Sequence, residues 1–344
     1  MARGDEGRRE ALTETAPKAL PANPFYAGWS VAAANGRLVP KGSVRWAAGA
    51  GARLPVRKAR RLGRLPLLHV AALAHDHCFS GEPDLGPDPQ AGLGALARAS
   101  DGSLLALVRV PEDAPAHAAL AAREGAVILQ TRHRAMLRSE AGYEPYVQGT
   151  LRAKKRKELR RLRARLAEVG EVGEATFSPG DDLAAWTEDF LALEAAGWKG
   201  EAGTAMGARE AERAYLGLLL EGARDAGALR LFRLTLGGRP AAMVIGLLGG
   251  AGGGRGGGLY TYKIAHDPSL ARYSPGVMVM LSVTRHVLGS EEIAYADSCA
   301  KEGHRMIEQL WAERRTLHDW LVPTNAAGRA ACAGLVALGK ARRP

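Results

Sequence analysis

The chain has few cysteines, few aromatic residues and no long apolar run. Its three cysteines, Cys78, Cys299 and Cys332, lie far apart and match neither a disulfide framework nor a zinc-site spacing. We therefore expect reduced thiols and no metal site. No stretch approaches the roughly 18 apolar residues that span a bilayer, and the charged N-terminus lacks the apolar core of a secretory signal. These absences predict a cytoplasmic protein without a transmembrane segment.

Positive charge is in excess, with a formal net charge of +11 over 344 residues. Such a balance suits an anionic partner, which can be nucleic acid, an anionic membrane surface or a phosphorylated cofactor. Residues 152–165 hold nine Lys or Arg against one Glu, and leucines at helical spacing run through them. The pattern predicts a helix that packs on one face. Its basic face is either a solvated connector or a grip for RNA or lipid head groups.

Apolar runs and turn signals divide the chain into two α/β lobes. In the second lobe, a Gly237–Gly238 turn joins two predicted strands, and a parallel crossover follows through a helix from 275 to about 288. We expect a loop at 197–208, a helix at 302–314 and a closing strand at 316–322. The predicted organisation is a disordered leader (1–23), a first lobe (24–150), a basic helix (151–170), a second lobe (171–322) and a loosely held basic tail (323–344).

The stretch ARYSPGVMVM, residues 271–280, predicts the start of a functional helix. Ser274 suits the N-cap and Pro275 the first helical position, where no backbone N–H is needed. A helix start at the edge of a sheet presents free N–H groups and the positive end of the helix dipole to an anion. Arg272 can add a charged contact, and Gly276 lets a ligand approach the backbone. A plain helix start with a solvated Arg272 is the alternative.

Three stretches resemble a known family: GWKGEAGTA (197–205), YTYKIAHDPSLARYSPG (260–276) and DSCAKEGHRMIEQLWAERR (297–315). They are similar to the GNAT acyltransferase superfamily, in its BioF2-like (CelD-type) branch, which is related to FemAB-type aminoacyl transferases. Weaker likeness extends to LAHDHCFSGEPDL (73–85). The resemblance implies tandem GNAT-like lobes, each a mixed and mainly antiparallel sheet flanked by helices. The first lobe would be degenerate and the second more complete.

The resemblance also implies acyl transfer from an acyl-CoA, such as acetyl-CoA, to an amine on a small molecule or an envelope precursor. It places the pyrophosphate of the donor on the loop and helix start. The residues concerned are Arg272, Tyr273, Ser274, Gly276 and Val277. Most GNAT enzymes have Arg/Gln-x-x-Gly-x-Gly/Ala here, whereas this chain has Arg-Tyr-Ser-Pro-Gly-Val. An aminoacyl-tRNA donor, or a binding protein with a decayed donor site, therefore stays open.

Catalytic candidates follow from strand alternation. In LYTYKIAHD (259–267), Tyr260, Tyr262 and Ile264 should share one face and Lys263 the other. A lysine in an otherwise apolar strand is unfavourable unless it is paired or lines a wet cleft, so Lys263 is a candidate to steady charge or to bind a substrate carboxylate. Asp297, at the end of the next strand, is either the general base or an N-cap.

The remaining substrate candidates surround this strand, each with a structural alternative. Trp198 and Lys199 line a pocket or anchor a loop, and Tyr262 lines the pocket or the core. Asp267 can pair with Lys263 or Arg272, and His304 touches substrate or lies on the surface. The His75–Cys78 segment offers two histidines but no third ligand, and we interpret it as structural. The glycine-rich stretch 249–258 lacks a Gly-Lys-Ser/Thr ending and predicts a flexible connection.

Overall fold

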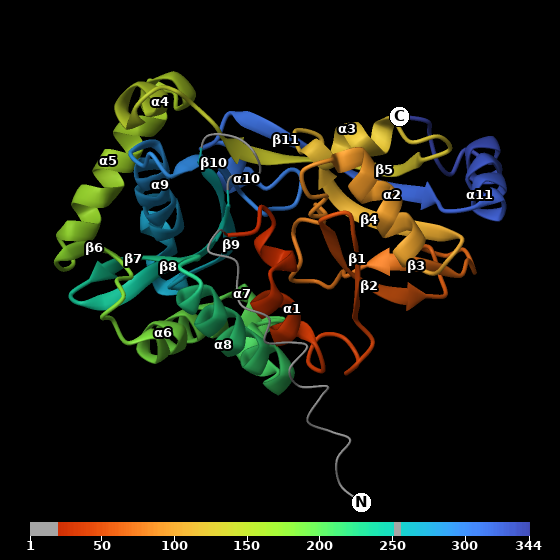
Figure 1. The fold of residues 1–344 in the computed structure, drawn as a ribbon. Coiled ribbons are helices and arrows are strands. Elements are labelled where there is room, and N and C mark those ends of the chain that lie inside the picture. The colour runs from red at the N-terminus through yellow and green to blue at the C-terminus, as the bar shows by residue number, and fades with distance from the viewer. Residues whose placement is uncertain (1–19, 251–255) are drawn as a thin grey trace, which may run out of the picture.

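The computed structural model describes residues 20–250 and 256–344. One mixed sheet of eleven strands forms its centre, in the order β1-β2-β3-β4-β11-β5-β10-β9-β8-β7-β6, with helices on its faces (Figure 1). Residues 1–19 of the expected leader and 251–255 of the glycine-rich connection lie outside the described residues. Among the residues that are described, no helix combines the length and apolar character needed to cross a membrane.

The first half of the sheet comes from residues 45–137. Its strands and helices are η2 (Pro24–Tyr26), α1 (Gly28–Ala34), β1 (Arg45–Gly49), β2 (Ala52–Ala59), β3 (His69–Ala72), α2 (Pro89–Ala99), β4 (Leu104–Pro111), α3 (Pro115–Ala121) and β5 (Val127–Leu137). Two helices, α4 (Tyr143–Thr150) and α5 (Ala153–Ala167), connect this half to the second. Leu159, Leu162 and Leu166 of α5 are buried, as their spacing predicts. Val169, which continues the same spacing beyond the end of α5, is 55% exposed.

The second half follows the expected strand and helix order. Its elements are β6 (Val172–Thr176), α6 (Leu183–Ala196), α7 (Trp198–Glu201), η3 (Met206–Ala208), α8 (Glu210–Asp225), β7 (Leu229–Leu236), β8 (Arg239–Gly249), β9 (Gly257–His266), η4 (Pro268–Tyr273), α9 (Pro275–Leu288), β10 (Ile293–Asp297), α10 (Arg305–Glu308) and β11 (Glu313–Pro323). Gly237 and Gly238 both have positive φ, as a tight hairpin turn requires. The loop expected at 197–208 contains α7 and η3 instead. The helix expected at 302–314 is only α10, because β11 already begins at Glu313.

The two halves repeat one connectivity and exchange their last strands. Each has a parallel pair, β3 with β4 and β9 with β10, linked by a helix, α2 or α9. The last strand of the first half, β5, pairs with β10 of the second, and β11 of the second half pairs with β4 of the first. β5 and β11 also pair with each other over most of their length. Because the halves share these strands, the sheet runs through the expected lobe boundary.

One large hydrophobic core extends through both halves. Helix α1 of the first half packs against α8 of the second (Figure 1). The tail is not loosely held: α11 (Ala326–Ala337) packs on β11 and buries Cys332 and Leu335 in a smaller second core. Burying this apolar face stabilises the helix against the sheet.

Candidate functional site

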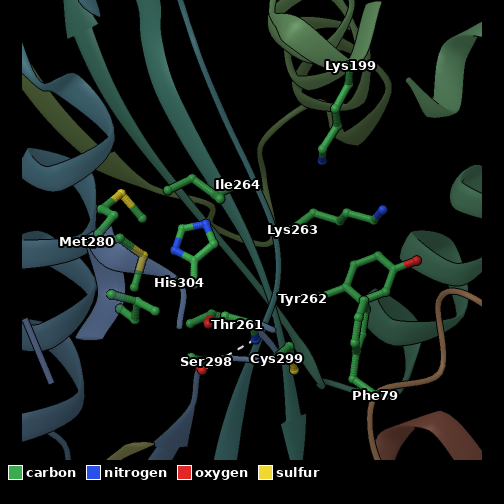
Figure 2. Close-up of a pocket in the computed structure, with 13 residues that line it drawn as sticks. Phe79, Lys199, Thr261, Tyr262, Lys263, Ile264, Met280, Ser298, Cys299 and His304 are labelled. Carbon is green, nitrogen blue, oxygen red and sulfur yellow. Dashed lines mark hydrogen bonds between the residues drawn. The ribbon is translucent and has the colours of Figure 1, made fainter. Parts of the chain in front are cut away.

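The sheet opens where β9 and β10 separate. They pair from Ile293 with Gly257 to Asp297 with Tyr260, and β10 then ends while β9 continues to His266. A cavity of about 160 Å³ lies at this opening (Figure 2). The side chains that line it come from β9, α7, α9, the segment after β10 and one loop of the first half. They are Phe79, Lys199, Thr261, Tyr262, Lys263, Ile264, Met280, Ser298, Cys299, Ala300, His304, Met306 and Ile307.

A β-bulge in β9 changes the expected alternation. Lys263 pairs with Ile245 but Thr261 pairs with Gly246, which leaves Tyr262 as the extra residue. Tyr262 and Lys263 therefore lie on the same side of the strand, with the Lys263 Nζ 5.7 Å from the centre of the Tyr262 ring, while Ile264 points to the other side (Figure 2). The prediction that Tyr262 and Ile264 share a face is wrong, because the bulge adds one residue to the period of two.

Two lysines approach this side of β9 (Figure 2). Lys199 of α7 forms an ion pair of 2.6 Å with Glu194, a carboxylate that is 3% exposed and also accepts the N–H of Met206. Lys263 forms no ion pair within the described part of the chain. Burial lowers the pKa of Lys263 to about 8, and the charge of Lys199 adds to this effect. At pH 7 Lys263 is therefore mainly an ammonium group. Its pKa is unusually low for a lysine, and its charge has no ion-pair partner among the described residues.

The start of α9 lies on the other side of the opening. Ser274 occupies the N-cap position, but in a left-handed conformation (φ 57°), and makes no side-chain bond to the helix within the described residues. The prediction of a hydroxyl cap is therefore wrong, because such caps form from extended backbone. Pro275 has no N–H, and the N–H groups of Val277 and Met278 donate to the carbonyl of Ser274, which leaves the N–H of Gly276 to an anion.

The other donor candidates surround this helix start. A Cβ at Gly276 would meet Met306, His266 and Ile264 at 3.6 to 3.8 Å, so the bare backbone of Gly276 faces the cavity side. Arg272 is exposed and its guanidinium lies 4.7 Å from the centre of the buried Tyr273 ring. Val277 is half-buried against the core. The structure thus brings all five donor candidates to one helix start beside the cavity.

Asp297 does not have the surroundings of a general base. It is fully buried and forms ion pairs with Arg134 of β5 (2.5 Å) and Arg315 of β11 (3.0 Å), and it accepts the N–H of Cys299. Burial alone would raise the pKa of this carboxyl, but the two guanidinium groups hold the pKa below its ordinary value. A carboxylate held in this way cannot readily take up a proton. The structure contradicts the base role and assigns Asp297 to the junction of the two halves.

The remaining predicted substrate residues separate. Asp267 caps η4 through the N–H of Ser269 and pairs with neither Lys263 nor Arg272 in the described chain. His304 is exposed at the start of α10 and lines the cavity opposite Lys263 (Figure 2). The backbone of Trp198 lies in α7, and its side chain is outside what the structure describes. Cys299 lines the cavity, but burial raises the pKa of its thiol well above the ordinary value, which does not favour a thiolate nucleophile.

A buried polar cluster that the sequence did not indicate lies behind Tyr262. The rings of His75 and His77 each lie 5.7 Å from Tyr215 of α8, and His77 lies 6.5 Å from Tyr262. Burial, followed by nearby cations, lowers the pKa of His77 to about 3 and of His75 to about 4. Both imidazoles are therefore neutral at pH 7. Tyr215 comes from an ordinary amphipathic helix, and only the fold brings it beside the histidines.

One group of possible metal ligands was also missed. Glu112, His117 and His318 each place a ligand atom within 4.8 Å of the others in the first half of the sheet. They come from three separate elements, so no spacing in the sequence reveals them. They are not among the residues that line the cavity.

The site combines a mixed sheet that opens between two parallel strands with a helix start that has no side-chain cap. Residues 153–304 match the sequence model of the acetyltransferase (GNAT) domain. This part of the chain is therefore similar to the GNAT acetyltransferase domain. A comparison with curated proteins gives no match.

Solved structures support the fold at low sequence identity. A conserved protein of unknown function from Bacteroides thetaiotaomicron is 14% identical, with a TM-score of 0.55 over 92% of this chain and 96% of its own. FemX is 10% identical, with a TM-score of 0.53 over 81% and 88%. The C-terminal domain of a putative lysylphosphatidylglycerol synthetase from Agrobacterium fabrum is 12% identical, with a TM-score of 0.51 over 87% and 88%. These likenesses extend over both halves of the sheet.

Proposed function

We propose that the protein transfers an acyl group from an acyl-CoA to an amine, in the cytoplasm, by direct attack of the amine on the thioester. The observation that carries the proposal is the uncapped start of α9 beside the opening between β9 and β10. The pyrophosphate of the donor would lie at the N–H of Gly276, with Val277 beside it and Arg272 and Tyr273 at its edge. Positive charge from the helix dipole favours this anion.

The acyl group would pass along the cavity to the bulge in β9. The extra residue of a bulge is left out of the strand ladder, so the peptide of Tyr262 can offer an N–H to the thioester carbonyl. A donor at this point stabilises the oxyanion that forms when the amine attacks. The acceptor would approach from the side of Lys199 and Lys263, opposite α9. Direct attack forms no acyl-enzyme, which agrees with the buried, protonated thiol of Cys299.

The test is thermal unfolding with free coenzyme A, acetyl-CoA and longer acyl-CoAs at two salt concentrations. A ligand at a hundred times its dissociation constant stabilises the native state by about 2.7 kcal/mol. We expect stabilisation by coenzyme A and a further increase with one class of acyl chain. If none of these compounds raises the unfolding temperature, the donor is not an acyl-CoA.

An aminoacyl-tRNA donor is the second candidate, and helix α5 favours it. Six of its basic side chains are exposed and form no ion pair with any described residue: Arg152, Lys154, Lys157, Arg160, Arg161 and Arg165. The helix packs against η4, which leads into the donor loop. A polyanion on α5 would therefore end near the start of α9. Binding of tRNA that weakens steeply with salt, without any effect of coenzyme A, would favour this function.

A further inference from the structure

The cavity is positively charged. Among the described residues that line it are two lysines and one histidine, and no aspartate or glutamate. Glu194, which pairs with Lys199, is already occupied, because its second oxygen accepts the N–H of Met206. The charge of Lys263 is left without an anionic partner in the described part of the protein. Lys263 is half-buried. Glu194, Glu212 and Asp76 act on its charge without forming an ion pair, so a ligand that supplies a direct anionic partner is favoured.

Hydrogen-bonding groups beside Lys263 are not fully satisfied. Tyr262 lines the cavity and is 3% exposed, and its hydroxyl lies next to the hydroxyl of Tyr215. Neither hydroxyl forms a hydrogen bond of good geometry to a described atom, and neither does Nε2 of His75. The N–H of His77 donates to Nδ1 of His75 (3.2 Å), which places the proton of this imidazole on Nε2. Buried polar groups without partners are rare in native proteins, and an occupied site is one explanation.

We infer that the acceptor is an amine that also carries an acidic group, a carboxylate or a phosphate, which binds at Lys263 and the Tyr262 hydroxyl. The inference rests on the proposed acyl transfer and specifies its acceptor. Lys263 supplies the cation and Tyr262 a hydroxyl donor, a pair that suits an anionic oxygen. The neutral His75 and His77 add no charge behind them. Amines without an acid group, such as diamines, would leave the charge of Lys263 without a direct partner in this cavity.

The same charge explains how the reaction proceeds without a carboxylate base. Cations near an ammonium group lower its pKa, so the acceptor enters the cavity more readily as the neutral amine. Its nitrogen then attacks the thioester carbon, the new C–N bond forms and the C–S bond breaks. The proton lost by the amine balances the charge of the departing thiolate, and free thiol leaves. No additional reactant is needed.

The experiment compares matched pairs of amines with acetyl-CoA as donor. Each pair differs only in the acid: lysine and cadaverine, phenylalanine and phenethylamine, phosphoethanolamine and ethanolamine. We expect kcat/KM to favour the acidic member of at least one pair by about tenfold or more, which corresponds to about 1.4 kcal/mol. Carboxylate and phosphate pairs then show which anion is preferred. A preference for the neutral members would overturn the inference.

Variants locate the effect. In Lys263→Met the preference for the acid should fall to about one, chiefly through a higher KM, while Lys263→Arg should retain it. Lys340→Met, at an exposed lysine of the tail, is the matched control and should behave as wild type. Stabilisation by acetyl-CoA, measured in parallel, should persist in all three. If acetyl-CoA does not bind even the wild type, the proposed function itself fails.

Two further outcomes decide against the inference. A donor with an acid on its acyl chain, succinyl-CoA, is compared with acetyl-CoA. If Lys263→Met removes a preference for the succinyl donor and leaves the acceptor preference unchanged, Lys263 binds the acid on the acyl chain of the donor and not the acceptor. If acetyl-CoA binds, but the acidic amines are neither acylated nor stabilise the coenzyme A complex more than their neutral partners, the acceptor does not carry an acid.

Discussion

The two halves of the sheet share a connectivity, but only one retains an open site. In the second half, β9 and β10 separate over a cavity and α9 starts without a side-chain cap. In the first half, Asp88 caps the corresponding helix α2 and accepts the N–H groups of Gln90 and Ala91. A carboxylate at this position occupies the place that an anionic ligand would take.

The corresponding opening of the first half is closed by its own chain. After β3, the segment that contains Gly81 turns back onto β4, and the N–H of Gly81 donates to the carbonyl of Arg109. The guanidinium of Arg109 in turn donates to the carbonyl of Cys78. From the same segment, Phe79 reaches the cavity of the second half. In the first half, this segment fills the place beside the parallel strands, and its Phe79 forms part of the wall of the other cavity.

The largest expected effect tests what the halves have in common, the junction at Asp297. Asp297→Asn leaves Arg134 and Arg315 buried without their carboxylate, and we expect a loss of about 3–5 kcal/mol in the free energy of unfolding. Denaturant unfolding measures this loss. Asp101→Asn, at an exposed aspartate, is the control and should change little. A variant that keeps its stability but loses activity would restore the base role.

Two glycines should respond oppositely if one opening is closed and the other open. A Cβ at Gly81 would overlap the carbonyl oxygen of Val108, so Gly81→Ala should lower the free energy of unfolding by about 1–3 kcal/mol. A Cβ at Gly276 meets only ordinary contacts, so Gly276→Ala should leave stability nearly unchanged. We expect it to weaken coenzyme A binding about tenfold, because the methyl group would lie against the proposed donor. Equal effects of both variants on stability, with none on binding, would contradict the comparison.

The helix starts sharpen the contrast. Asp88→Ala removes a side-chain acceptor from two N–H groups and should lower the free energy of unfolding by about 1 kcal/mol. Ser274→Ala removes no such bond and should change stability far less. The two variants are measured by denaturant unfolding without ligand. A similar loss in both would show that the Ser274 hydroxyl caps α9 after all.

Local signals in the sequence predicted the parts of the site that depend on local structure. Ser274, Pro275 and Gly276 marked the start of α9, and the Gly237–Gly238 pair marked the hairpin. Each depends on backbone preferences within a few residues, which a single sequence reveals. The resemblance to GNAT enzymes predicted that the donor binds at the helix start after β9, and this stays a prediction.

Long-range pairing could not be predicted in the same way. The partners of Asp297, Arg134 and Arg315, come from β5 and β11, which exchange between the halves. The bulge at Tyr262 depends on the register of β9 against β8, and a shift of one residue reverses every face. The expected base role of Asp297 and the expected shared face of Tyr262 and Ile264 therefore failed for the same reason. The pattern along a strand does not specify the strand beside it.

The smallest expected effect is the pH dependence that Lys263 adds to the open half. Burial lowers its folded pKa to about 8 from an ordinary value of 10.5, so the unfolded chain binds more protons between these two pH values. Stability contributed by this group therefore rises with pH across that range. At pH 7 Lys263→Met should be more stable than wild type. The expected gain in the free energy of unfolding is about 1 kcal/mol or less, because the side chain is only half-buried. This gain should shrink from pH 8 toward 10.5. Unfolding curves at several pH values, with Lys340→Met as control, measure the difference. A difference in stability that stays constant with pH would mean that Lys263 has an ordinary pKa. The ammonium group of Lys263 would then be solvated, and its position would give no reason to expect an anionic ligand.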